Sequence, residues 1–155
     1  MDQNTYNPKA AFRAIRIIYF AILIGPVIFL SIVLTMKNWN LPDSGNITDP
    51  LNIGFVLILL TVPMVYKQAN KVLTQKQGAD FRHKMATYQT SLIIKVAIWE
   101  GLGIFSAVVL LLADNTMALL FFAMALVGII SNFPNPFRFG PKIGLNSSEI
   151  EKLKF

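Results

Sequence analysis

The sequence predicts an all-α fold: a four-helix transmembrane bundle with both termini cytoplasmic and a helical hairpin extending into the cytoplasm between the second and third helices. Three observations lead to this prediction. Of the 155 residues, 54% are hydrophobic and only 14% are charged, which is too few charges for a water-soluble domain of this size. Long apolar runs alternate with short polar segments. Lys and Arg gather in every second polar segment, a pattern typical of multi-pass membrane proteins.

Each of four apolar segments is long enough, or nearly so, to cross the bilayer core as a helix, which takes about 20 residues. We expect one membrane domain covering residues 1–155, with spans at about residues 17–36, 51–67, 91–113 and 117–132. The first segment follows three basic residues, as a signal peptide would. Its apolar run is too long for a signal peptide and no small-x-small cleavage site follows it, so we interpret it as a retained helix.

The polar segments between the spans contain local start and stop signals. Residues 37–50 are rich in turn formers and predict a loop. Residues 67–89 are expected to form the cytoplasmic hairpin, in which Gly78 breaks the helix and Asp80 caps the next one. A tight polar turn at Asp114 separates the third and fourth spans.

After the fourth span, residues 133–155 are expected to form a polar, basic cytoplasmic tail. Ser148 and Glu151, three residues apart, match a capping box, in which a side chain at each end of the first helical turn bonds to the backbone of the other. This pattern predicts a short helix near the C-terminus.

The distribution of Lys and Arg predicts the orientation. The N-terminal segment has three, the hairpin five and the tail four, whereas the loop at residues 37–50 has one and the Asp114 turn none. The three basic segments fall on one side only if there are four spans, and that side should be cytoplasmic. A short, basic, cysteine-free chain of this kind fits the bacterial inner (cytoplasmic) membrane.

The formal net charge of +6 is best explained by the lipid bilayer and its anionic headgroups, and we expect no nucleic-acid partner. Basic side chains of the hairpin should contact these headgroups: Lys67, Lys71, Arg82 and Lys84. The chain has no cysteine and one histidine, so a Cys/His metal cluster is impossible within it. No His-Glu-x-x-His motif, glycine-rich phosphate loop or nucleophile–base set occurs. We therefore expect no metal, no cofactor and no enzymatic activity.

One residue stands out against the apolar spans. Glu100 lies about ten residues into the third span, roughly 14 Å from its start and so near the midplane of a ~30 Å core. A carboxylate there costs at least ~3 kcal/mol unless it is protonated, paired or hydrated. Burial favours the neutral acid, so Glu100 is the candidate proton- or ion-binding residue, or a protonated carboxyl that joins helices by hydrogen bonds.

Small residues share the helical face of Glu100, at Ala97, Gly103 and Ala107, and would let another helix approach closely. This spacing predicts that Glu100 points into a helix–helix contact. Lys95 lies about 140° around the helix from Glu100 and is expected to extend toward the cytoplasmic surface.

Further polar groups are predicted at the depth of Glu100 on other spans. Pro63, beside Thr61 on the second span, leaves a backbone carbonyl without its helical donor, and the Gly25-Pro26 pair on the first span does the same. Together with Ser106 on the third span, these groups would form a small polar core around Glu100. The prolines can equally be ordinary kinks, which membrane helices tolerate.

The run from Ala97 through Trp99-Glu100-Gly101 to Phe105, followed by Val108-Val109-Leu110-Leu111, resembles the carboxylate-bearing helix of the rotor-ring proteolipid subunits of rotary ATP synthases. The resemblance covers about 20 residues, and it implies an ion-carrying role for Glu100 alone. The glycine- and alanine-rich partner helix and the Arg-Gln-Pro type loop of that family have no counterpart here. As a whole, the chain resembles the small four-span inner-membrane proteins of many bacteria.

Two functions follow from these observations. The first is a non-enzymatic accessory or structural membrane component, in contact with a membrane-protein partner or further copies of itself, with Glu100 as a buried protonatable group. The alternative is a proton- or cation-linked transport protein that acts as an oligomer through Glu100. Comparing ion flux in liposomes between the wild type and Glu100→Gln would separate them.

Overall fold

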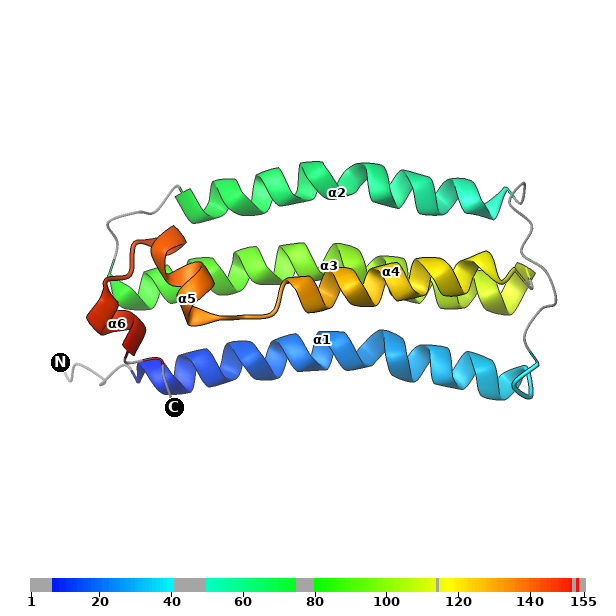
Figure 1. Ribbon diagram of the computed structural model, residues 1–155, viewed down its shortest axis with the longest axis horizontal. Helices are drawn as coiled ribbons and strands as arrows, with labels where there is room; N and C mark the ends of the chain where they lie inside the picture. Colours follow the sequence, from blue (N-terminus) through cyan, green and yellow to red (C-terminus); the bar gives the residue numbers. More distant parts are fainter. Residues whose placement is uncertain (1–6, 41–49, 75–79, 114, 152, 154–155) are drawn as a thin grey trace.

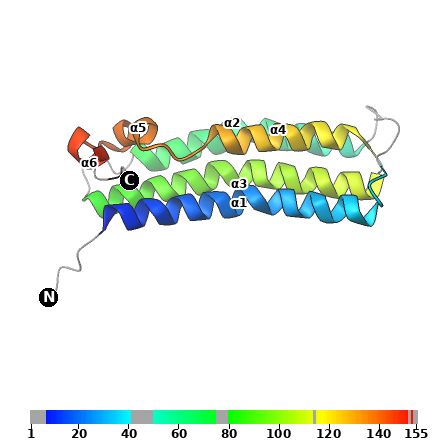
Figure 2. The ribbon, with the colours of Figure 1, turned by 60° about the horizontal axis from the view of Figure 1, so that its bottom comes forward.

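The structure is a computed structural model that describes residues 7–40, 50–74, 80–113, 115–151 and 153. It is helical throughout, and no strand occurs in the described ranges. Four long helices run side by side (Figures 1 and 2) and a short helical segment follows them. Their bounds are α1 (Pro8–Met36), α2 (Leu51–Thr74), α3 (Phe81–Ala113), α4 (Met117–Ser131), α5 (Pro136–Phe139), the 3₁₀ turn η1 (Gly140–Ile143) and α6 (Ser147–Glu151). The predicted all-α class is confirmed.

Three of these helices, α1, α2 and α3, are long and apolar enough to cross a membrane. The fourth, α4, has 15 residues, and at ~1.5 Å per residue it reaches only about 22 Å. It ends at Ser131, before Pro134 and Pro136, and a bend of 76° separates it from the segment Pro136–Ile143. Within the described residues, three helices could therefore span a membrane, or four if this bent pair crosses as one.

Helix α3 is the centre of the bundle and packs against α1, α2 and α4. In Figure 1, α2 and α1 flank α3 and α4, and the start of α1, the end of α2 and the start of α3 lie at the same end of the bundle as α5 and α6. We call this the basic end, because all the described Lys and Arg residues except Lys37 and Lys95 lie in the segments that meet there. Lys95 extends toward it from α3.

The two arms of the predicted hairpin between the second and third spans are helical in the structure. Helix α2 continues to Thr74 and α3 already begins at Phe81, so both extend well beyond the apolar spans. The Asp80 carboxylate accepts a hydrogen bond of 2.7 Å from the Phe81 N–H, and the Asp80 carbonyl accepts one of 3.0 Å from the Lys84 N–H. Asp80 therefore stands at the helix start, as expected; Gly78 lies outside the described residues.

The C-terminal segment, predicted to be a polar tail, makes apolar contacts with the helices of the bundle. It folds back on the bundle, and four of its apolar side chains are buried in the core of the basic end: Phe139, Ile143, Leu145 and Leu153. The Phe139 ring stacks on that of Tyr88, with centroids 3.7 Å apart. The Lys84 ammonium donates to the Gly144 carbonyl at 2.7 Å. The segment that was expected to be a polar tail thus covers the helix ends at the basic end and buries apolar side chains against them.

The short helix α6 begins two residues earlier than predicted. Its capping box joins Asn146 and Glu149: the Asn146 side chain accepts from the Glu149 N–H, and Glu149 accepts from the Asn146 N–H, each at 2.8 Å. The predicted pair of Ser148 and Glu151 is therefore wrong. Both pairs have the right spacing, but asparagine is at least as good an N-cap as serine. Leu145, the residue before Asn146, is buried in the core, and this places Asn146 at the start of the helix.

Replacing the capping Asn146 by alanine should loosen α6 without unfolding the bundle. Loss of such a cap costs about 1 kcal/mol, so backbone amides of α6 should exchange with deuterium about fivefold faster in a mass-spectrometric measurement. Ser147→Ala, an exposed neighbour with no described hydrogen bond, is the matched control and should leave the rate unchanged. Equal rates in the two variants would contradict the cap.

Candidate functional site

The carboxyl group of Glu100 lies against the backbone of α1. A Cβ built on Gly25 would be 3.4 Å from Glu100 Oε1, so the absence of a side chain at Gly25 makes room for the acid. Glu100 is half-buried and has no hydrogen-bond or ion-pair partner among the residues that the structure describes. It therefore lies at the seam between α1 and α3, open on one side.

The small residues near Glu100 divide between two environments. Gly103 is buried, and a Cβ at this position would meet the Pro26 Cβ at 3.1 Å, so this glycine allows α1 and α3 to pack closely. Ala107 is fully buried. Ala97, in contrast, is exposed, and so is Gly101, around which a built Cβ meets no atom within 4 Å. Gly103 and Ala107 therefore have the predicted packing role within the bundle, whereas for Ala97, which lies on the surface, that role stays a prediction.

The predicted polar core does not form as a set. Thr61 and Pro63 are exposed on α2, and the Thr61 hydroxyl donates to the Ile58 carbonyl of its own helix at 2.7 Å. The hydroxyl of Ser106 is buried but donates to the Leu102 carbonyl at 2.7 Å. Of the predicted neighbours, Gly25 lies against the Glu100 carboxyl. Depth in the membrane was predicted from chain position, but the direction in which each residue faces depends on how the helices pack.

A polar network that sequence reasoning missed joins α2, α3 and α4. The Trp99 indole N–H donates to the Tyr66 hydroxyl at 3.0 Å, and the Asn132 side-chain amide donates to the same oxygen and to the Gly128 carbonyl. Trp99 packs directly on Gly128, where a Cβ would come within 2.1 Å of the ring. Trp99 is thus a packing residue between α3 and α4.

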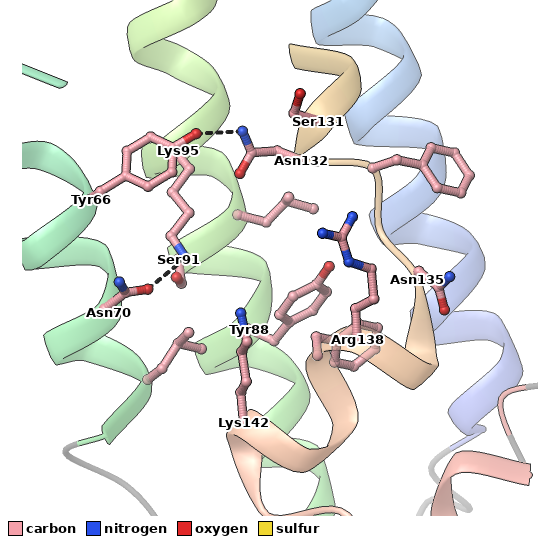
Figure 3. A pocket seen from close by; sticks show the side chains of 14 residues that line it. Tyr66, Asn70, Tyr88, Ser91, Lys95, Ser131, Asn132, Asn135, Arg138 and Lys142 are labelled. Atoms are coloured by element: carbon pink, nitrogen blue, oxygen red, sulfur yellow. Dashed lines mark hydrogen bonds between the residues drawn. The ribbon is translucent and has the colours of Figure 1, made fainter. Parts of the chain in front are cut away.

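Beside this network, toward the basic end, lies a cavity of about 310 Å³ between α2, α3, α4 and the C-terminal segment. We call it the basic pocket. Fourteen described residues line it, of which ten have polar side chains and three carry positive charge: Lys95, Arg138 and Lys142. None of the fourteen is an Asp or Glu. Figure 3 shows the three cationic side chains converging on the cavity from α3, α5 and η1.

Two of the groups in the basic pocket have informative surroundings. The Lys95 ammonium donates to Asn70 Oδ1 at 2.7 Å and lies 5.6 Å from the centre of the Tyr66 ring, and its charge is repelled by that of Lys142. The Ser91 hydroxyl is buried and has no hydrogen-bond partner among the described residues. A buried hydroxyl without a hydrogen bond costs about 1–3 kcal/mol. The Ser91 hydroxyl is therefore available as a hydrogen-bond donor in the pocket.

The sequence did contain a signal for this pocket. Tyr88, Ser91 and Lys95 are spaced three and four residues apart, which puts three polar side chains on one face of a helix. Arg138 and Lys142 are also four apart. The predicted headgroup residues lie elsewhere: Lys67, Lys71 and Arg82 are exposed at the basic end, whereas Lys84 is half-buried and bonded to the C-terminal segment.

The chemistry available to these sites is binding and charge compensation. Within the described residues, no three His, Cys, Asp or Glu side chains lie close enough together to hold a metal ion. Comparison with protein families, with curated proteins and with solved structures found no match to this chain.

Proposed function

We propose that the protein is a non-enzymatic accessory component of the bacterial inner membrane, which joins a partner helix or a second copy of itself through the Glu100 side of α3. The observation that carries the proposal is a half-buried carboxyl at the α1–α3 seam that has no partner among the described residues. In a membrane such a group is costly unless a donor reaches it. A hydrogen-bonding side chain of another helix would offset that cost.

The surface beside Glu100 suits such a partner. Ala97 and Gly101 are small and exposed, and Ile104 continues the same face one turn later. Small residues on a membrane helix let a second backbone come close and strengthen van der Waals packing. We call these three residues the open face of α3.

The proposed topology has four spans and cytoplasmic termini, with α4 and the bent segment after it crossing as one. The meeting of the basic segments at one end of the bundle supports it (Figure 1). Cytoplasmic loops carry an excess of Lys and Arg, so the basic end would face the cytoplasm and the end with Lys37 would face outward.

The alternative is proton- or cation-linked transport by an oligomer. It is supported by the same carboxyl, because an unpaired acid that is open on one side could take up and release an ion. The two functions make different demands on Glu100: helix joining needs a hydrogen-bonding group, whereas transport needs a group that can ionise.

Glu100→Gln and Glu100→Ala should therefore separate the two functions. If Glu100 joins helices as a neutral acid, Gln keeps the hydrogen bond and the assembly, whereas Ala lowers the assembled fraction at least fivefold. Native mass spectrometry of protein extracted in mild detergent measures that fraction, and liposomes with a pH-sensitive dye measure proton flux. Flux in the wild type that Glu100→Gln abolishes would favour transport instead.

Gly101→Leu tests the open face independently of the acid. The position has room in the isolated chain, so the variant should fold but should block a close partner helix. Thr61→Leu, on the exposed face of α2, is the matched control. A wild-type protein that is a lone monomer in mild detergent would contradict the accessory role.

A further inference from the structure

We propose that the basic pocket is a binding site for a phosphate group, with Lys95, Arg138, Lys142 and the Ser91 hydroxyl as its donors. Three cations converge on one cavity of about 310 Å³ with no carboxylate among the residues that line it. If the chain itself neutralised these three cations, an Asp or Glu side chain would line the pocket. Its absence leaves room for an anion from outside the chain.

The identity of the donors favours phosphate over a smaller anion. Arg138 presents a planar guanidinium that can bond two oxygens of one tetrahedral group at once, while Lys95 and Lys142 contribute point charges from other sides. The cavity is at the lower end of the ~300–1,000 Å³ range of small-molecule pockets. It is thus larger than a single monatomic ion needs and has the size of a headgroup.

Ser91 supplies an observation that is independent of charge. Its side chain is only 1% exposed and lines the cavity, yet its hydroxyl has no hydrogen-bond partner in the part of the chain that the structure describes. Buried hydroxyls in proteins are nearly always bonded. A phosphate oxygen in the cavity would accept this bond, together with those of the neighbouring cations.

The depth of the pocket indicates where its phosphate comes from. Lys95 and Ser91 lie about 10 and 17 Å along α3 from residue 102, the middle of the predicted third span. The hydrocarbon core ends about 15 Å from its middle, where the headgroup region begins. Lipid phosphates lie at this level, and basic pockets between membrane helices on the cytoplasmic side are suited to anionic headgroups.

The test uses the full-length protein, stripped of lipid in dodecyl maltoside, with three probes: phosphatidylglycerol, phosphatidylcholine and inorganic phosphate. Melting temperature and native mass spectrometry report binding. Phosphatidylglycerol should bind one to one and raise the melting temperature, and phosphatidylcholine should bind more weakly because its choline adds a positive charge near three others. Saturable binding of inorganic phosphate with no lipid binding would make the source a soluble phosphate at the same site.

The matched pair of variants is R138Q/K142Q against K67Q/K71Q. Each removes two positive charges from the basic end, but Lys67 and Lys71 do not line the pocket. The first should weaken binding of the phosphate probe at least tenfold and the second less than twofold. S91A should weaken it about threefold, and K142Q alone serves if the double variant does not fold.

Equal losses in the two double variants would mean diffuse attraction to the surface and would overturn the proposal. So would the absence of binding by all three probes. Neither result bears on Glu100, whose test measures assembly and flux, so the two proposals fail separately.

Discussion

Gly128→Ala should destabilise the bundle by about 3 kcal/mol, although alanine is the better helix former by ~1 kcal/mol. The new Cβ would lie 2.1 Å from the Trp99 ring, far inside van der Waals contact. Either α3 and α4 separate or the indole rotates away. Rotation would break the bond from the Trp99 N–H to the Tyr66 hydroxyl, now 3.0 Å long, and would leave the part-buried indole N–H without this acceptor.

Unfolding by sodium dodecyl sulfate in mixed micelles, followed by circular dichroism, measures this change in the free energy of unfolding. Tryptophan fluorescence in a Trp39→Phe background should also report a changed environment of Trp99. Gly101→Ala is the matched control, because no atom lies within 4 Å of a Cβ there. It should be neutral or stabilising by up to ~1 kcal/mol; a Gly128→Ala variant as stable as this control would contradict the packing of Trp99 on α4.

Phe139→Ala should release the C-terminal segment from the basic end. The Phe139 side chain is 4% exposed, stacks on Tyr88 and lies 5.8 Å from the Phe12 ring, centroid to centroid. Removing a buried phenylalanine costs about 3–5 kcal/mol. We expect this to exceed the free energy that holds a short segment outside the long helices on the bundle. The segment should therefore open locally while α1 to α4 remain folded.

Limited trypsin digestion measures this opening, since Arg138 and Lys142 lie in the segment. A cost of ~3 kcal/mol corresponds to cleavage roughly 100-fold faster when the segment opens and closes rapidly relative to cleavage. Phe137→Ala, at a side chain that is 59% exposed, should accelerate cleavage much less. If both variants are cut at the wild-type rate, the segment is held by other contacts. Because the segment carries Arg138 and Lys142, Phe139→Ala should also weaken the phosphate site.

The helices themselves were predictable because their signals are local. An apolar run of about 20 residues, a proline after it and a capping residue before it act within one or two turns of the chain. The bounds of α1, α3 and α4 therefore agree with the predicted spans to within a few residues, once the extensions of α1 and α3 at the basic end are allowed for. The same holds for the basic segments, since charge counts need no knowledge of packing. The capping box of α6 shows the limit: Asn146 and Ser148 offered two starts, and the burial of Leu145 favours the earlier one.

The candidate sites depended on contacts between residues far apart in the chain. Sequence alone could place Glu100, Thr61 and Gly25 at a similar depth, but depth leaves the rotation of each helix open. Packing of Gly103 on Pro26 brought α1 to the Glu100 side of α3 and left Thr61 facing outward on α2.

The sequence by itself thus determined a helical membrane bundle with one charged end and one acid in its apolar middle. Only the tertiary structure showed that this acid has no partner within the described chain. Likewise, only the folding of the C-terminal segment onto Tyr88 brought Arg138 and Lys142 to Ser91 and Lys95. The physical reason is the same in both cases: hydrophobicity and charge act residue by residue, whereas a site requires side chains from several helices to meet, and the packing of those helices decides which ones do.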